Sequence, residues 1–260
     1  MQILVLTKPV PDPAAGAERL GPDLRLDRAA SPTVVNGNDE YALEAALQLV
    51  EANGGEVIVL SMAPATATET MRKALAMGAA RGIHVTDPAL EGADMPTTIR
   101  VLAAAAKQEP FDLLLTGIDT SDGTGGAVAA GVAARLGLPL LSAAASIEPH
   151  RETERVTVKR LSAKGYDVIE APMPAVIACT QALGAPRYPS LKGIMAARSR
   201  EIATRSLADV GADVAPGGGW ATRVLEAEAP PPRAAGRVVR QPAAEAAKTV
   251  ADFLAERRII

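Results

Sequence analysis

The sequence predicts an α/β fold, with a doubly wound, mainly parallel, Rossmann-like sheet, antiparallel additions, and an extended C-terminal arm and helix. Two observations predict it. In the first half of the chain, short apolar runs alternate with segments whose apolar residues repeat at helical spacing. In the second half, strand-like runs lie closer together and are separated by turn-forming residues. The chain has 260 residues, 48% of them hydrophobic, and is therefore large and apolar enough to bury such a core.

Four short apolar runs in the first half are predicted strands, and the amphipathic segments between them are predicted helices. The strands are expected at residues 3–6, 56–60, 82–85 and 112–116, and the helices at residues 40–51, 68–77 and 96–107. The apolar face of the first helix is formed by Ala42, Leu43, Ala46, Leu47 and Val50. Asp94 stands where the third helix needs an N-cap. This alternation indicates a parallel sheet covered by helices on both faces.

After residue 140 the pattern changes to strands linked by turns. Strand-like runs cover residues 142–147, 155–162, 166–170 and 175–179, with turn signals in EPHRETE and AKG. They predict an antiparallel addition to the same sheet. Residues 208–232 are rich in Gly, Pro and Ala, which is typical of an extended arm, and residues 243–257 are a predicted helix. We therefore expect an α/β domain over residues 1–207, and an arm and helix over residues 208–260 that need another surface to lie on.

The composition argues against several classes of partner. Aromatic residues make up 2% of the chain and the net charge is -3, so neither base stacking nor a basic face for nucleic acid or anionic membranes is expected. The lone cysteine, Cys179, lies in the apolar run PAVIACT and is predicted to be a buried core thiol. His84 and His150 have no ligands at metal-binding spacing, so no metal site is expected. With no apolar run long enough to span a bilayer, we expect a cytoplasmic protein.

The stretch LLLTGIDTSDGTGGAVAAGVAARLGLP has the pattern of a phosphate-binding loop: an apolar strand, a small-residue loop, and a helix. It is not a P-loop, because it has no lysine, and Val128 stands where the dinucleotide fingerprint requires its last glycine. Gly123, Gly125 and Gly126 allow backbone N–H groups to converge at a helix start, where an anion is favoured. Such a site would hold a phosphate rather than transfer it. A ligand-free, glycine-rich helix entry is the other interpretation, and both stay open.

The charge of this loop is unusual for a phosphate site. It contains no lysine or arginine and carries Asp119 and Asp122. We expect Asp122 to cap the following helix or to accept hydrogen bonds from loop amides. Two further segments, LTKPVPDP and SMAPATATET, follow predicted parallel strands, and ligands bind at such carboxyl ends where the strand order reverses.

Several motifs together resemble one family. They are LVLTKPVPDP, VNGNDEYALEAALQLVE, RKALAMGAARGIHV, the glycine-rich loop with LGLP behind it, PRYPSLKGIMAARSREI, and RAAGRVV before the last helix. In their order and spacing, they resemble the beta subunit of electron-transfer flavoprotein over nearly the whole chain. The resemblance implies an adenine-nucleotide-binding fold in a heterodimer whose alpha subunit holds most of the FAD, with an AMP of no catalytic role in this subunit. It also implies an electron carrier without its own reaction, which serves acyl-CoA or related dehydrogenases of fatty acid oxidation and a membrane quinone reductase.

The resemblance carries the AMP contacts onto four parts of this chain. They are Leu6, Asn36, Gly37, Asn38, Asp39, Met62, Gly117, Ile118, Asp119, Thr120, Ser121, Asp122, Gly123, Thr124, Gly125, Gly126, Ala127 and Val128. The chain departs from many relatives in having GID where they have GKQ, and Ala127 where they have a glutamine. It also has NGN in place of NPF, and Pro13 in place of an aromatic residue. These departures remove side-chain contacts and leave the backbone ones.

The segment of residues 186–200 has two interpretations. From the pattern alone it is a strand-to-helix connection, capped by Ser190, with Leu191, Ile194 and Met195 packed inward. The resemblance instead implies a loop that docks on acyl-CoA dehydrogenases, with Leu191 inserted into the partner, Arg187 and Tyr188 holding the loop, and nearby cations steering the encounter. The docking residues are then Pro186, Arg187, Tyr188, Leu191, Ile194 and Met195.

Three alternatives to this interpretation remain. One is an electron-bifurcating relative, with a second FAD in place of AMP. Another is an ATP-hydrolysing enzyme of related fold, which the missing basic residues in the loop disfavour. The third is a stand-alone AMP-binding module, which leaves the docking loop unexplained. In each interpretation with an alpha subunit, the arm and last helix are expected to clasp it, and Trp220 to anchor the arm there.

Overall fold

The computed structural model describes residues 1–15, 19–214, 220–228, 231, 236 and 238–260. They fall into two units, Met1–Leu225 and Glu226–Ile260. Parts of the predicted arm, including residues 215–219 and 229–230, and most of the RAAGRVV motif lie outside the described residues.

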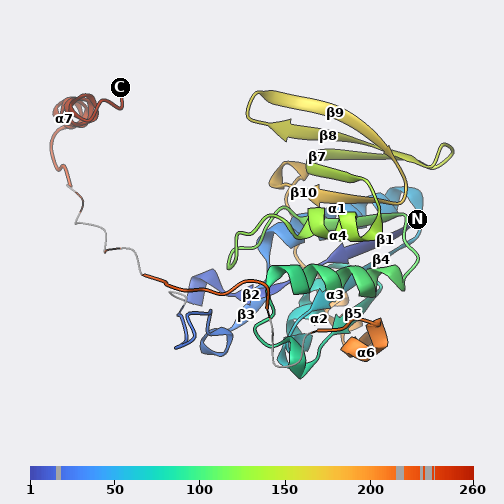
Figure 1. The fold of residues 1–260 in the computed structure, drawn as a ribbon. Helices are drawn as coiled ribbons and strands as arrows, with labels where there is room; N and C mark the ends of the chain where they lie inside the picture. The colour runs from blue at the N-terminus through green and yellow to red at the C-terminus, as the bar shows by residue number, and fades with distance from the viewer. Residues whose placement is uncertain (16–18, 215–219, 229–230, 232–235, 237) are drawn as a thin grey trace. The chain divides into compact units, whose positions relative to one another are not determined.

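The first unit is built on a sheet whose described strands number nine and run in the order β11-β5-β4-β1-β6-β10-β7-β8-β9 (Figure 1). In chain order they are β1 Gln2–Leu6, β4 Glu56–Met62, β5 Arg81–Val85, β6 Leu113–Gly117, β7 Leu140–His150, β8 Arg155–Ser162, β9 Gly165–Pro172, β10 Ala175–Cys179 and β11 Ile202–Arg205. Neighbours from β11 to β7 pair in parallel, whereas β7–β8 and β8–β9 pair antiparallel. Two short strands, β2 Pro9–Pro11 and β3 Thr33–Val35, form a separate ribbon.

Helices cover both faces of the sheet because its strands alternate their side chains between two apolar clusters. Ile3 and Val5 of β1 belong to one cluster, with α1 Gly37–Asn53, α2 Thr68–Met77 and the end of α5 Leu191–Ala197. Leu4 and Leu6 belong to the other, with α3 Met95–Lys107, α4 Val128–Leu136 and α6 Leu207–Val210. Short 3-10 turns complete the unit: η1 Pro13–Ala15, η2 Arg28–Ala30, η3 Ala65–Ala67, η4 Pro88–Leu90 and η5 Gln181–Leu183. The predicted α/β fold is confirmed.

One strand prediction is wrong. Residues 175–179 were expected in the antiparallel addition, but β10 lies between β6 and β7 and is parallel to both. All five of its residues are buried, which is typical of a parallel strand covered on both faces. The strand β11, a half-buried edge strand, was not predicted, because its four residues IATR lack a clear apolar period. The antiparallel addition is therefore limited to β8 and β9, which extend the sheet from β7 (Figure 1).

The strand order places a topological switch point between β1 and β6. From β1 the chain proceeds to β4 and β5 on one side, then returns to place β6 on the other side of β1. The connections that leave the carboxyl ends of β1 and β6 therefore diverge, and ligands of open α/β sheets bind at such a position. The glycine-rich loop follows β6, so the fold brings it beside the LTKPV segment.

Two titratable residues lie in the core of the sheet. Burial raises the pKa of the Cys179 thiol above its ordinary value, so it stays protonated, as expected of a core cysteine. His84 of β5 is 1% exposed, and its Nε2 lies 3.0 Å from the Ala63 carbonyl oxygen. Both residues are packed rather than presented to solvent.

The described part of the second unit contains one helix, α7 Ala243–Glu256, which confirms the predicted terminal helix. None of its described side chains is buried, although Val250 and Phe253 are apolar. The Arg257 guanidinium lies 4.3 Å from the centre of the Phe253 ring. Among the described helices, none combines the length and apolar character needed to cross a bilayer.

Candidate functional site

The glycine-rich loop joins the end of β6 to α4 at the switch point. Thr124 N–H donates to the Thr120 carbonyl at 2.8 Å, and Thr124 and Gly126 take positive φ values of 42° and 58°. Ala127 precedes α4 and offers no side-chain cap. The first-turn N–H groups of α4 are therefore available to an acceptor from outside the helix.

Two cations from other segments of the chain bring positive charge to the glycine-rich loop. Lys8 Nζ lies 2.9 Å from Asp122 Oδ1, and Arg28 Nη2 lies 2.6 Å from Asp122 Oδ2. Burial alone would raise the pKa of Asp122, but the Lys8 charge and hydrogen bonds from Lys8, Arg28 and Thr120 lower it below its usual value. Of the two roles predicted for Asp122, the helix cap is wrong, because α4 has no side-chain cap and the carboxylate pairs with these cations. Acceptance of hydrogen bonds from loop amides stays a prediction.

The NGN segment supports the loop from the side of α1. Asn36, which is 1% exposed, donates from Nδ2 to the Asp119 carbonyl at 2.8 Å and accepts from Ser121 N–H at 3.2 Å. Asn38 Nδ2 donates to Asp119 Oδ1 at 2.5 Å. The structure thus gives both asparagines a role in holding the loop, and their predicted contact with a nucleotide stays a prediction.

Asp39, at the start of α1, is hydrogen-bonded to the chain just after β1 and to the end of β6. Its Oδ2 accepts from Lys8 N–H at 2.8 Å, and the carboxyl group also accepts from Gly117 N–H. Burial raises the pKa of Asp39 to about 7, against hydrogen bonds from Asn36, Lys8 and Gly117 that lower it. A methyl group on Gly117 would lie 2.5 Å from Asp39 Oδ1, so only glycine allows this approach.

The remaining predicted nucleotide residues line the same edge of the sheet. Leu6 ends β1 and is buried, and Met62 ends β4 and packs half-buried against the second apolar cluster. Ile118, directly after β6, is 39% exposed. The structure therefore brings Leu6, Met62 and the glycine-rich loop to the carboxyl edge of three neighbouring strands, β1, β4 and β6. The fourth predicted group, residues 36–39, reaches this edge from the start of α1.

The predicted docking residues lie elsewhere, around the start of α5. Tyr188, Leu191, Ile194 and Met195 are 95%, 75%, 45% and 64% exposed, and we call these four residues the docking patch. The inward-packing interpretation is wrong, because Ala197 is the buried residue of α5. Exposed apolar side chains that adjoin one another mark interaction surfaces.

The docking patch is held by charge and by close packing. Arg187 donates to Glu44 of α1 from Nε at 2.7 Å, from Nη2 at 3.0 Å and from its N–H at 3.1 Å. It also donates to Glu51 at 2.5 and 3.1 Å, and these hydrogen bonds raise its pKa. Tyr188, predicted to help hold the loop, is almost fully exposed and does not pack against it.

The helix α5 itself is fixed against α2. Ser190 caps α5 by accepting from Gly193 N–H at 3.0 Å. A methyl group on Gly193 would lie 2.4 Å from the Ala76 carbonyl oxygen, so this glycine allows the two helices to touch. Arg72 donates to the Ala197 carbonyl at 2.8 Å and completes the attachment.

Comparison with known proteins identifies the family. The electron transfer flavoprotein domain family matches residues 23–210. The chain belongs to this family. It is 38% identical over 218 residues to the electron transfer flavoprotein subunit beta of Mycobacterium leprae, covering 82% of this chain and 81% of that protein. It is 33% identical over 264 residues to the subunit beta of Thermoanaerobacterium thermosaccharolyticum, and 35% identical over 266 residues to the caffeyl-CoA reductase-Etf complex subunit CarD of Acetobacterium woodii, each over the full length of both chains.

Family membership supports a role in electron transfer. The relatives named subunit beta imply an alpha subunit as partner, and the name of the Acetobacterium woodii protein places it in a reductase complex.

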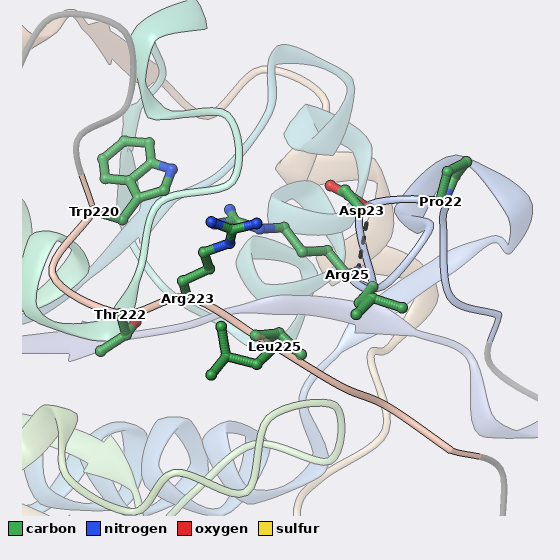
Figure 2. A pocket seen from close by; sticks show the side chains of 9 residues that line it. Pro22, Asp23, Arg25, Trp220, Thr222, Arg223 and Leu225 are labelled. Carbon is green, nitrogen blue, oxygen red and sulfur yellow. Dashed lines mark hydrogen bonds between the residues drawn. The ribbon is translucent and has the colours of Figure 1, made fainter.

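Sequence reasoning missed a cavity of about 510 Å³ in the first unit. It is lined by Pro22, Asp23, Leu24, Arg25, Trp220, Thr222, Arg223, Val224 and Leu225. Figure 2 shows Arg25, Trp220 and Arg223 among the side chains that line this cavity. The segment from Trp220 is attached by Thr222, whose N–H donates to Asp94 Oδ2 at 3.0 Å. Because Asp94 Oδ1 also caps α3 by accepting from Thr97 N–H at 3.0 Å, one carboxylate orders both segments.

Sequence reasoning also missed Lys8 and Arg28 at the glycine-rich loop. Lys8 lies in the LTKPV segment, which was predicted at the same sheet edge, so that prediction contained a usable signal for it. Arg28 lies in a segment without periodicity and 94 residues before Asp122, and no local pattern points to it.

Proposed function

We propose that this chain is the beta subunit of a heterodimeric electron-transfer flavoprotein that binds AMP at the glycine-rich loop. FAD, held mainly by the alpha subunit, supplies the redox chemistry when bound. The carrier takes electrons from acyl-CoA or related flavin dehydrogenases and passes them to a membrane quinone reductase. This chain provides a rigid wall for the flavin domain and the surface on which dehydrogenases dock.

One observation carries the nucleotide part of the proposal: a helix start without a side-chain cap, preceded by three glycines, at the switch point of a parallel sheet. The residues fit a phosphate group. Gly123, Gly125 and Gly126 leave the backbone open, and Lys8 stands beside the loop. The half-buried Met62 side chain, at the end of β4, provides apolar surface for a base.

The exposed docking patch supports the partner part of the proposal. A small contact centred on one apolar anchor gives a specific complex that dissociates quickly, which suits electron transfer. Leu191 is the anchor that we propose, because Arg187 and Gly193 fix its surroundings while its side chain stays exposed. Lys192 and Arg198 are exposed and can steer an acidic partner. Arg200 instead donates to the Leu75 carbonyl at 2.5 Å and is half-buried, so it serves the attachment of α5.

The nucleotide proposal is tested by co-expressing the chain with an alpha subunit, purifying the complex and quantifying the nucleotides released on denaturation. Equal amounts of FAD and AMP are expected. Two FAD and no AMP would assign the chain to the bifurcating alternative, and a complex without flavin would refute the carrier function. ATP turnover is measured on the same sample. Lys8 and Arg28 bring positive charge to the loop, so ATP turnover by the pure complex would favour the hydrolytic alternative.

The docking proposal is tested by Leu191→Ala, with Val168→Ala as the matched control. Val168 is an apolar side chain of β9, 64% exposed, compared with 75% for Leu191. We expect Leu191→Ala to slow electron transfer from an acyl-CoA dehydrogenase about tenfold or more, as truncation of an interface anchor does. Equal rates in the two variants would refute the docking role of the patch.

A further inference from the structure

Asp122 is a buried carboxylate in an otherwise glycine-rich loop, and its burial requires an explanation. Its side chain is 1% exposed, and it is bonded to cations from two different segments, one after β1 and one in η2. Burial of a carboxylate costs free energy that is offset only by paired charges and hydrogen bonds. A small neutral residue at this position would avoid the cost of burying a charge, so we infer that Asp122 is there to hold the two cations in place.

The two cations are only partly covered by this pairing. The Lys8 side chain is 37% exposed and that of Arg28 is 40% exposed. An ammonium group has three donors and a guanidinium five, whereas Asp122 receives one from each cation. Each cation therefore retains capacity for a further anionic partner.

Both groups stand at the glycine-rich loop itself. A methyl group on Gly123 would lie 3.8 Å from Lys8 Nζ, and Thr120 Oγ1 lies 3.4 Å from the same atom. The open first turn of α4 begins at Val128, at the end of the same loop. An anion on the loop would thus meet the ammonium group of Lys8 as well as the backbone N–H groups.

We propose that Lys8 and Arg28 complete the phosphate site of this loop, and that Asp122 is a positioning residue that holds both cations in place. The inference rests on the proposed nucleotide function and deepens it. The ligand class is a nucleotide with a phosphate group, as opposed to the nucleoside. Because hydrogen bonds to charged groups are stronger than neutral ones, the cations supply a large part of the discrimination between AMP and adenosine.

The test uses the complex with the alpha subunit, depleted of nucleotide by dialysis in mild urea, and calorimetric titration with AMP and with adenosine. Lys8→Met and Arg28→Met are compared with Lys164→Met, a control at the exposed turn between β8 and β9. Each of the first two is expected to weaken AMP binding about 10- to 100-fold and to leave adenosine binding unchanged. AMP binding to the unaltered complex should also weaken as salt is raised.

Asp122→Asn separates positioning from charge. If Asp122 acted only through its negative charge, its removal would tighten AMP binding. As a positioning residue, its replacement should weaken AMP binding severalfold, with adenosine binding and the thermal midpoint close to those of the unaltered complex.

The outcomes distinguish this inference from the proposed function. AMP affinity unchanged in Lys8→Met and Arg28→Met, or adenosine binding weakened as much as AMP binding, would overturn the inference while the nucleotide site stands. An unaltered complex that releases no nucleotide on denaturation and binds no AMP would refute the proposed function itself. If Lys8→Met prevents assembly, Arg28→Met carries the comparison, and Lys8→Arg, which keeps the positive charge, should retain most of the AMP affinity.

Discussion

Replacing Gly117 by alanine tests the closest contact of the candidate site. The added methyl group would lie 2.5 Å from Asp39 Oδ1, 2.7 Å from the Asn38 carbonyl carbon and 2.8 Å from Asn38 Cβ. Two of these atoms belong to the well-fixed start of α1, so no rotation of a flexible side chain removes the overlap. Overpacking of this kind costs about 1–3 kcal/mol, and we expect about 2 kcal/mol for Gly117→Ala.

Gly37→Ala is the matched control for stability alone, because Gly37 is itself a predicted nucleotide contact; it lies two residues from Asp39, and a methyl group there meets nothing within 4 Å. As a helical position, it should be unchanged or more stable by up to about 1 kcal/mol. Both variants are made in the complex with the alpha subunit, and the thermal midpoint and the retained nucleotide are measured. We expect Gly117→Ala to lower the midpoint by about 4–8 °C and to reduce the retained nucleotide. The reasoning fails if both variants match the unaltered complex in midpoint and nucleotide content.

Three further outcomes follow from the charges and the terminal helix. Because burial raises the pKa of Asp39 from 3.8 to about 7, the folded state holds its proton more tightly, so stability should fall as pH rises through this interval. Asp39→Asn should flatten that slope in pH-dependent unfolding, and an unchanged slope would contradict the assignment. Arg187→Ala leaves the buried Glu44 carboxylate without its main partner and should lower the free energy of unfolding by about 2 kcal/mol. Glu51→Ala removes only an exposed partner of Arg187 and should lower it by less than about 1 kcal/mol. Thermal midpoints of the two variants measure the difference. Deletion of residues 226–260, a unit whose described helix buries no side chain of its own, should abolish co-purification with the alpha subunit in a pull-down; full recovery would refute the clasp.

Local pattern was sufficient for most of the sheet and its helices. The apolar runs that became β1, β4, β5 and β6 are short, and helical repeats separate them, so both the elements and their parallel pairing follow from periodicity. β10 was placed wrongly because the turn signals before it outweighed its composition. Its unbroken apolar run AVIAC was the better indicator of a central parallel strand.

The ion pairs between residues far apart in the sequence could not be predicted from local pattern. The glycine-rich loop and the edge at which it lies follow from the sequence, but the pairing of Asp122 with Arg28 depends on how a non-periodic segment folds back across the loop. The Arg187–Glu44 pair joins residues that are 143 positions apart. The sequence shows which residues are charged, but the tertiary fold alone decides which of them pair.

The helix α1 connects the two candidate surfaces. Near its start, Asp39 is bonded to Lys8 and Gly117 at the glycine-rich loop, and five residues later Glu44 is bonded to Arg187 beside the docking patch. At about 1.5 Å per residue, the two attachment points are less than 10 Å apart along the helix axis. Over so short a length an α-helix does not bend appreciably, so a ligand that fixes the loop also limits the movement of α1, to which Arg187 beside the docking patch is bonded. A nucleotide without a catalytic role would then serve docking by keeping α1 in place, which gives a physical reason for retaining a nucleotide site in an electron-carrier subunit.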